Sequence, residues 1–182
     1  MANTAILYVT HNRIDKTKIS LPAVLGASKM DFDLYIYDNA STDGTREYLA
    51  SLNNPKIKNI SYQEKNMGLG YPHNVITCEL AKDYPFVGKI DNDICPTRNW
   101  LEKFHQAFED NPNFAVLGAS HGWNEWEEHW SDKMQVCGKT VYMPVEVPGG
   151  NWIARSSTLL GKTVPGGFAS PRPEMVWCTR CD

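Results

Sequence analysis

The chain has 182 residues, of which 42% are hydrophobic and 21% are charged, and its formal net charge is −3. This length and composition indicate one globular domain with a sizeable core, so we predict a single domain over residues 1–182. The weakly acidic balance excludes a general attraction to nucleic acid or to anionic membranes. No stretch approaches the roughly 20 apolar residues that a membrane helix needs, and no signal peptide is recognisable. We therefore predict a cytoplasmic protein without a membrane segment.

Two strand–helix pairs begin the chain. The run AILYVT (residues 5–10) predicts a buried strand, and the helix after it has an apolar face made of Leu21, Val24, Leu25 and Ser28. The run DLYIYD (33–38) predicts a second strand. The segment STDGTREYLASL then predicts a second helix, with Ser41 or Thr42 as its N-cap.

Two further pairs follow. IKNISYQ (57–63) predicts a third strand, followed by a helix that ends near Lys82, and FVGKID (86–91) predicts a fourth. We expect the next helix to begin near Thr97 and to have one broad apolar stripe, made of Trp100, Leu101, Phe104, Ala107 and Phe108. FAVLGAS (114–120) predicts a fifth strand.

Alternating strands and helices with short loops predict an α/β fold, with a mostly parallel central sheet covered by helices on both faces. The pattern changes after residue 120. MQVCGKTVYMPVEV alternates in the manner of a hairpin or an edge strand, which predicts a small antiparallel β addition toward the C-terminus.

Polar residues follow each of the first four predicted strands. They are Thr10 to Arg13, Asp38 to Asp43, Glu64 to Gly68, and Asp91 to Asp93. Because ligands of open α/β sheets bind at the carboxyl ends of the strands, we expect these segments to converge on one binding site.

The stretch FVGKIDNDICP contains two aspartates separated by one residue, directly after an apolar run. On an extended backbone Asp91 and Asp93 would point to the same side, and two oxygen ligands open to solvent suit Mg²⁺ or Mn²⁺. The alternative is that one aspartate caps the following helix while the other pairs with a lysine or an arginine. Lys89 either faces bound phosphates or is an ordinary surface lysine.

Four segments in this order, LYVTHNR, YDNASTDGTREYL, EKNMGLGYPHN and KIDNDICPTRNWLEKF, resemble the family 2 glycosyltransferases of the GT-A fold. The similarity spans about residues 5 to 119. It implies a nucleotide-sugar donor, most often UDP-linked, a divalent metal (Mn²⁺ or Mg²⁺) and inversion at the anomeric carbon. It leaves open whether the acceptor is a glycan, a lipid or a protein.

The resemblance also implies roles for single residues. The nucleoside would lie along Thr10 and Arg13 with its base bonded by Asp38, and Asn66 and Asn74 would help to close this pocket. Close approach of the backbone to the donor is implied at Gly68 and Gly70. Asp91 would lie by the ribose or the metal, and Asp93 would bind the metal directly.

The second half of the chain, residues 96–182, corresponds to the acceptor side of the family, and residues 1–95 to its nucleotide-binding half. PGGNWIARSS (148–157) resembles the segment that lines the donor sugar, although it also fits a strand preceded by a Gly-Gly turn. Glu174 is the nearest match to the family's catalytic base, with the acidic residues Glu125, Glu127, Glu128 and Asp132 as alternatives. Because family members generally continue beyond such a point, we expect either a minimal enzyme or a further acceptor-binding part after Asp182.

Several alternatives stay open. Trp123, Trp126 and Trp130 fit either an acceptor platform or core packing, and His121 and His129 fit either a metal site or ordinary loop positions. A non-catalytic nucleotide-sugar or glycan-binding module would keep the donor site without a base. A sugar-1-phosphate nucleotidyltransferase would need a glycine-rich basic loop after the first strand, and THNRIDKTK contains no glycine.

Overall fold

The computed structural model of the chain describes residues 2–68, 70–119, 130–136, 139–144, 150–159 and 177–179. Its strands are β1 (Thr4–Thr10), β2 (Asp33–Asp38), β3 (Ile57–Tyr62), β4 (Phe86–Asp91), β5 (Val116–Ala119), β6 (Trp130–Val136), β7 (Lys139–Pro144), β8 (Asn151–Arg155) and β9 (Trp177–Thr179). Its helices are α1 (Ile14–Gly26), α2 (Thr45–Ala50), α3 (Gly70–Val75), the π-helical turn η1 (Ile76–Leu80), α4 (Ala81–Asp83), α5 (Trp100–Asp110) and α6 (Ser156–Leu159).

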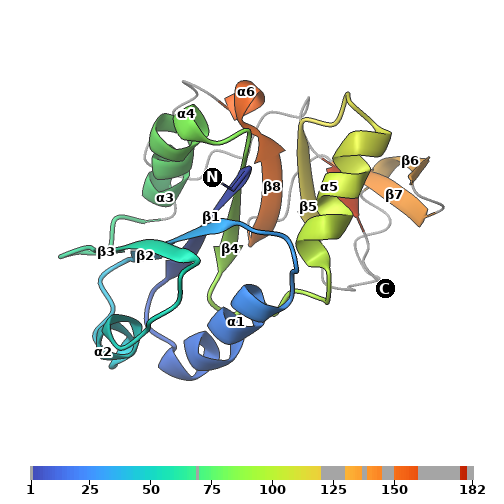
Figure 1. The fold of residues 1–182 in the computed structure, drawn as a ribbon. Coiled ribbons are helices and arrows are strands. Elements are labelled where there is room, and N and C mark those ends of the chain that lie inside the picture. The colour runs from blue at the N-terminus through green and yellow to red at the C-terminus, as the bar shows by residue number, and fades with distance from the viewer. Residues whose placement is uncertain are drawn as a thin grey trace.

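The described strands form one sheet in the order β3-β2-β1-β4-β8-β5-β9-β7-β6. The first four strands of this order, β3, β2, β1 and β4, are parallel to one another, as the repeated strand–helix pattern predicts. Strand β8 lies antiparallel between β4 and β5, and β6 and β7 form an antiparallel hairpin. The predicted α/β class with an antiparallel addition toward the C-terminus is therefore confirmed (Figure 1).

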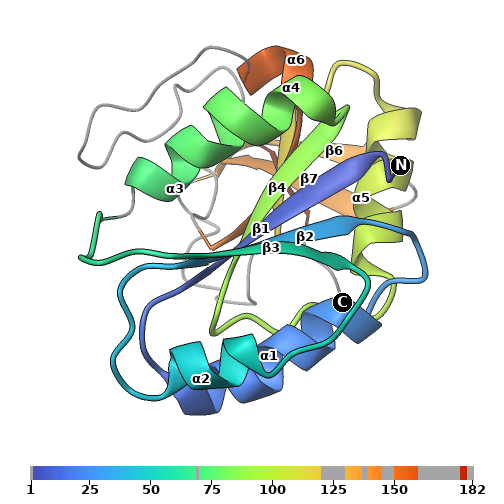
Figure 2. The same ribbon diagram turned by 60° about the vertical axis from the view of Figure 1, so that its left-hand side comes forward.

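Helices cover both faces of the parallel part, with α1 and α2 on one side and α3 and α4 on the other (Figure 2). Strand β1 is buried along its whole length and supplies both cores. Ile6 and Tyr8 pack in the cluster that contains residues of α1 and α5, whereas Leu7 and Val9 pack in the cluster that contains residues of η1. A strand covered on both faces has little need for polar residues before its end. The polar residues near the end of β1, from Thr10 to Arg13, therefore lie where the strand leaves the core.

Three local predictions were wrong at the ends of helices. Helix α2 begins at Thr45, and its N-cap is Gly44 in the left-handed region (φ 91°) rather than Ser41 or Thr42. The Asp43 carboxylate accepts hydrogen bonds from the Thr45 amide and hydroxyl, so the aspartate satisfies the helix end. Helix α1 ends at Gly26, so that Ser28 is buried but lies beyond the helix.

Helix α5 begins at Trp100 rather than near Thr97, after Asn99 in the left-handed region. Its apolar stripe is buried as predicted. Neither Asp91 nor Asp93 caps this helix, so that part of the alternative interpretation of the two aspartates is wrong. Strand β5 is shorter than the predicted 114–120 and covers Val116–Ala119.

Within the described residues, no helix has both the length and the apolar character needed to cross a membrane.

Candidate donor-binding site

A cleft of about 350 Å³ opens where β1, β2 and β4 end. Its lining residues are Val9, His11, Arg13, Asn39, Asn66, Gly68, Asp91, Asn92 and Asp93. Five of them are residues for which the sequence predicts a role in the site, namely Arg13, Asn66, Gly68, Asp91 and Asp93. The segments after all four strands therefore contribute to one cleft.

The two aspartates of the cleft are each paired with a cation. Lys89 Nζ lies 2.5 Å from Asp91 Oδ1, and Arg13 Nη1 lies 2.7 Å from Asp93 Oδ2. Lys89 is only 3% exposed, so the alternative of a surface lysine is wrong. Burial raises the pKa of the Asp91 carboxyl above its usual value, and the charge of Lys89 opposes this rise. Strand β4 ends at Asp91, so Asp93 enters the cleft from a turn and not from an extended strand.

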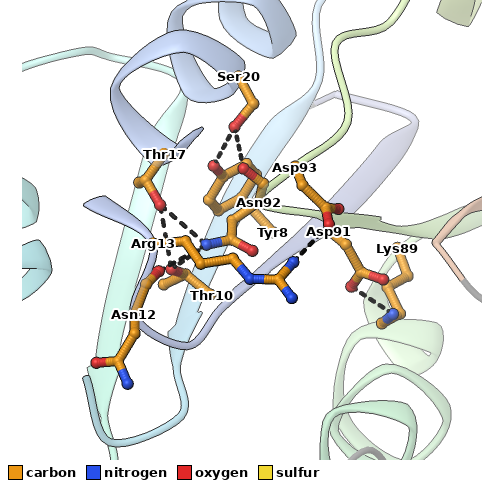
Figure 3. Close-up of polar contacts among 10 residues, drawn as sticks. All are labelled: Tyr8, Thr10, Asn12, Arg13, Thr17, Ser20, Lys89, Asp91, Asn92 and Asp93. Atoms are coloured by element: carbon orange, nitrogen blue, oxygen red, sulfur yellow. Dashed lines mark hydrogen bonds and ion pairs between the residues drawn. The ribbon is translucent and has the colours of Figure 1, made fainter. Parts of the chain in front are cut away.

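The residue between the aspartates, Asn92, joins this turn to β1 and α1 (Figure 3). Its side-chain amide donates toward Thr10 Oγ1 at 3.0 Å, Thr17 Oγ1 at 3.0 Å and the Asn12 carbonyl at 2.9 Å. Its own carbonyl accepts a hydrogen bond from Ser20 Oγ at 2.7 Å. Asn92 is 7% exposed. The aspartates on either side therefore project from a turn that is anchored in the protein interior.

The loop between β1 and α1 has an unusual backbone. Asn12 and Arg13 both adopt left-handed conformations, with φ of 56° and 60°, which non-glycine residues seldom do. Asn12 stabilises this loop by contacts with the segment after β2: its amide donates to Ser41 Oγ at 2.7 Å, and its Oδ1 accepts from the Thr42 amide at 2.8 Å. The loops after β1 and β2 thus form one connected wall of the cleft.

The loop after β3 is held by Asn39. The Asn39 side chain donates to Asn66 Oδ1 at 2.9 Å and accepts from the Met67 amide at 2.7 Å. Asn66 Oδ1 also accepts from the Gly68 amide at 2.8 Å, and Gly68 has a φ of 74° that favours glycine. The side chain of Asn66 is therefore part of the loop's own structure, and Gly68 forms the adjacent rim of the cleft.

Four residues with predicted donor contacts lie outside the lining of the cleft, and one of them, Gly70, is the first residue of α3. The Thr10 side chain is buried and hydrogen-bonded to Asn92. Asp38 is fully buried, and its Oδ2 accepts from Arg46 Nε at 2.8 Å and from the Ser41 amide at 3.1 Å. Its Oδ1 has no hydrogen-bond partner among the described residues. Asn74 lies on α3.

A second group of side chains lies next to Lys89 in the sheet. The ring of His73 stacks on Trp152 with centroids 5.6 Å apart, and Trp152 of β8 is the register partner of Lys89. Burial lowers the pKa of His73 to about 4, and the charge of Lys89 acts in the same direction. His73 is therefore neutral near pH 7, which avoids a second positive charge beside the buried lysine.

Gly150, the residue before β8, lies against Asp91. The Asp91 amide donates to the Gly150 carbonyl at 2.8 Å, and a Cβ added at Gly150 would lie 2.8 Å from Ile94 Cδ1 and 3.4 Å from Asp91 Oδ2. A side chain at this position would therefore require the end of the Ile94 side chain to shift, and it would lie in contact with the Asp91 carboxylate. The segment predicted to line the donor sugar thus adjoins the cleft, and it is also a strand preceded by a turn.

The carboxylate oxygens that the cleft offers as ligands fit a hard divalent cation. The described residues include no group of three or more His, Cys, Asp or Glu side chains that could hold a metal ion. An ion bound by Asp93 and Asp91 would complete its coordination with water and donor phosphates, which is the usual way in which proteins bind Mg²⁺ and Mn²⁺.

Several predicted residues lie outside the described part of the chain. They are Glu174, Glu125, Glu127, Glu128, His121, His129, Trp123 and Trp126. Asp132 and Trp130 lie in β6. His11, Asn39 and Asn92 line the cleft although the sequence predicts no individual role for them. For Asn92, the available signal was a neutral amide between two carboxylates immediately after a buried strand.

Solved structures of other proteins share this fold. TarS of S. aureus (residues 1–349) superimposes with a TM-score of 0.66 at 17% identity, over 98% of this chain and 58% of TarS. The complex of the same TarS fragment with UDP-GlcNAc gives a TM-score of 0.62 at 15% identity, over 100% and 59% of the two chains. The mannosyltransferase PcManGT of Pyrobaculum calidifontis, in complex with GDP-Man and Mn²⁺, gives 0.63 at 13% identity, over 97% and 56%.

The chain spans less than two thirds of the length of these proteins. The superpositions establish the GT-A fold, but at such low identities they do not establish a shared substrate. The sequence itself matches the family described as Glycosyl transferase family 2 over residues 5–164, which is most of its length. The match includes every segment that lines the cleft. The chain therefore belongs to glycosyl transferase family 2.

Proposed function

We propose that the chain is a metal-dependent, inverting glycosyltransferase that moves a sugar from a nucleotide-sugar donor to an acceptor hydroxyl. The observation that carries this proposal is the cleft in which two carboxylates lie among the side chains that follow four parallel strands. Its volume of about 350 Å³ falls in the range of small-ligand sites. Family membership favours sugar transfer over nucleotidyl transfer. The complexes of TarS with UDP-GlcNAc and of PcManGT with GDP-Man support a nucleotide-sugar donor.

The donor in this proposal is UDP-linked. Asp38, the residue that the resemblance pairs with the base, is fully buried and lies outside the lining of the cleft, so the side chains that cover it must move before it can bond a base. Arg46 and the Ser41 amide already occupy Oδ2, so Oδ1 alone is left to accept a hydrogen bond. Uracil presents one ring N–H, whereas guanine presents a ring N–H and an amino group side by side, which suit a carboxylate with two available oxygens. A single acceptor therefore suits uracil better than guanine.

The chemistry assigns a task to each part of the cleft. Asp93 and Asp91 would hold the divalent ion, which would supply Lewis-acid stabilisation of the charge on the leaving diphosphate. Arg13 supplies further positive charge at the same cleft. Glu174 remains the predicted base that accepts the proton of the acceptor hydroxyl, a contribution of roughly 10²–10⁴-fold in rate.

Calorimetric binding of UDP, GDP, ADP, CDP and TDP, each with Mn²⁺ and with EDTA, tests the donor site. We expect UDP to bind most tightly, and Mn²⁺ to strengthen its binding. Asp93→Asn should abolish the effect of Mn²⁺ while the protein stays folded. Asp31→Asn is the matched control, because it removes the same charge from an exposed position outside the cleft.

A folded wild type that binds no nucleotide under any of these conditions would refute the donor site. Tight GDP binding with weak UDP binding would refute the assignment of uracil as the nucleobase of the donor. Nucleotide binding without sugar transfer, in a screen of UDP-sugars against glycan, lipid and protein acceptors, would favour a binding module over an enzyme.

A further inference from the structure

The two cations that pair with the aspartates of the cleft differ in their exposure, and only Arg13 itself lines the cleft. Asp91 and Asp93 carry two negative charges, and Lys89 and Arg13 carry two positive charges, so these four side chains sum to zero. A divalent ion is attracted to a net negative site. Its binding at Asp93 is therefore opposed by whichever cation already lies there.

Of the two cations, only Arg13 is free to leave. Lys89 is 3% exposed and is paired with Asp91, and its strand partner Trp152 is stacked on the ring of His73. The Arg13 side chain is 63% exposed, and its Asp93 partner is 42% exposed. An exposed pair of this kind is weak, since water solvates both charges well when they separate.

The position of Arg13 in the fold also argues against a purely stabilising role. Arg13 is the N-cap residue of α1, where it makes no side-chain capping bond and where the helix dipole disfavours a positive charge. Its backbone is left-handed, which adds strain for a side chain of this size. Local rules broken without a gain in stability are characteristic of functional positions.

The geometry points to an exchange, and we propose it as a mechanism that rests on the proposed function. Arg13 stays paired with Asp93 until a divalent ion and a nucleoside diphosphate bind. Its guanidinium group then leaves Asp93 and pairs with the diphosphate instead. Arg13 and Asp93 line the same cleft, and the Asn12 carbonyl, fixed by Asn92, anchors the backbone from which Arg13 projects. Guanidinium groups bind phosphate oxygens through paired N–H donors, so the diphosphate offers Arg13 a partner as good as the carboxylate.

This exchange makes metal and nucleotide bind cooperatively. Each ligand alone must break the Arg13–Asp93 pair, whereas the two together break it once. A surface pair of ordinary strength implies an additional coupling of about two- to sixfold, beyond the coupling that arises because the ion contacts the phosphates directly.

The test uses Mn²⁺ and UDP as probes and measures binding only, by Mn²⁺ electron paramagnetic resonance and by calorimetry. In Arg13→Gln, Mn²⁺ alone should bind about two- to sixfold more tightly than in the wild type. The factor by which Mn²⁺ strengthens UDP binding should fall by a similar amount. Lys16→Gln is the matched control, because it removes the same charge from an exposed position one turn away. It should leave both quantities unchanged.

Asp93→Asn supplies an independent arm. With EDTA present, this variant should bind UDP about two- to sixfold more tightly than the wild type, because Arg13 is released. The gain should vanish when Arg13→Gln is combined with it. A gain that persists in the double variant would mean that Asp93 simply repels the diphosphate, and would overturn the exchange.

The remaining outcomes separate the two proposals. Unchanged or weakened Mn²⁺ binding in folded Arg13→Gln, or no Mn²⁺ binding in either protein, overturns the exchange even if UDP binds well. A gain in Mn²⁺ binding by Arg13→Gln, together with no UDP binding by the wild type, refutes the donor site but supports competition between Arg13 and the ion at Asp93.

Discussion

Replacing Asn92 by alanine tests whether the turn that carries both aspartates is anchored by its central residue. The Asn92 amide lies within hydrogen-bonding distance of three oxygens, two of them threonine hydroxyls and the third the Asn12 carbonyl. Because the side chain is 7% exposed, water cannot easily replace it at these oxygens. The substitution removes every one of these bonds at once.

The magnitude follows from the burial of these groups. The amide has two N–H donors. About 1 kcal/mol for each of two hydrogen bonds, together with a penalty of about 1–3 kcal/mol for the Asn12 carbonyl left without a donor, gives a loss of about 3–5 kcal/mol in the free energy of unfolding. The two threonine hydroxyls are 3.4 Å apart and can reorient toward each other, which favours the lower half of this range. Asn92→Asp should lose at least as much, because it places a carboxylate against three oxygens.

Urea denaturation followed by circular dichroism at pH 7 measures the loss directly. Asn53→Ala is the control, since Asn53 is exposed and lies in a loop away from the cleft, and it should change the stability by less than about 0.5 kcal/mol. A loss below about 1 kcal/mol for Asn92→Ala, with an unchanged m-value, would refute the anchoring role. Below its unfolding transition, the variant should also bind Mn²⁺ and UDP more weakly, because Arg13 and Asp93 lose their common support.

Two further predictions concern the framework of the site. Gly88→Ala would place a Cβ 2.6 Å from the Trp152 carbonyl oxygen, so the free energy of unfolding should fall by about 3 kcal/mol. In the control Gly26→Ala the added Cβ meets nothing within 4 Å, so this variant should be neutral or slightly stabilised. Thermal unfolding compares the two variants. The pKa of His73 is lowered to about 4, so the unfolded chain binds more protons than the folded one between pH 6.5 and 4. The free energy of unfolding should therefore decrease by up to about 3 kcal/mol as the pH falls through this window. His73→Phe should remove this part of the pH dependence. A proton NMR titration of the wild type measures the pKa itself. A His73 pKa near 6.5 would contradict the inferred burial.

Much of the fold could be predicted because it depends on local periodicity. The apolar runs of β1, β2, β3 and β4 and the apolar stripe of α5 are contained in short windows of sequence, and each is observed within a few residues of its predicted bounds. The convergence of their polar ends followed from the geometry of parallel sheets alone. The helix ends were less predictable, because a single contact, such as that of Asp43 with Thr45, decided where α2 begins.

The details of the site depend on contacts between residues far apart in the chain. Asn92 and Thr10 are 82 positions apart, and Arg13 and Asp93 are 80 apart, so no periodic pattern relates them. The insertion of β8 between β4 and β5 is equally non-local, although it places Gly150 beside Asp91. Lys89 illustrates the point, since one polar residue in a strand is consistent with either face until the covering helix is known.

The sequence by itself therefore determined which residue types lie at the ends of the strands and that these ends meet. It could do so because the side-chain periods of helices and strands, and the direction of parallel strands, are properties of the backbone. Only the tertiary structure decided which cation faces which carboxylate, and that Lys89 is buried whereas Arg13 is exposed. These pairings depend on the packing of β8 and η1 against β4, and burial is a property of the assembled layers rather than of any segment alone.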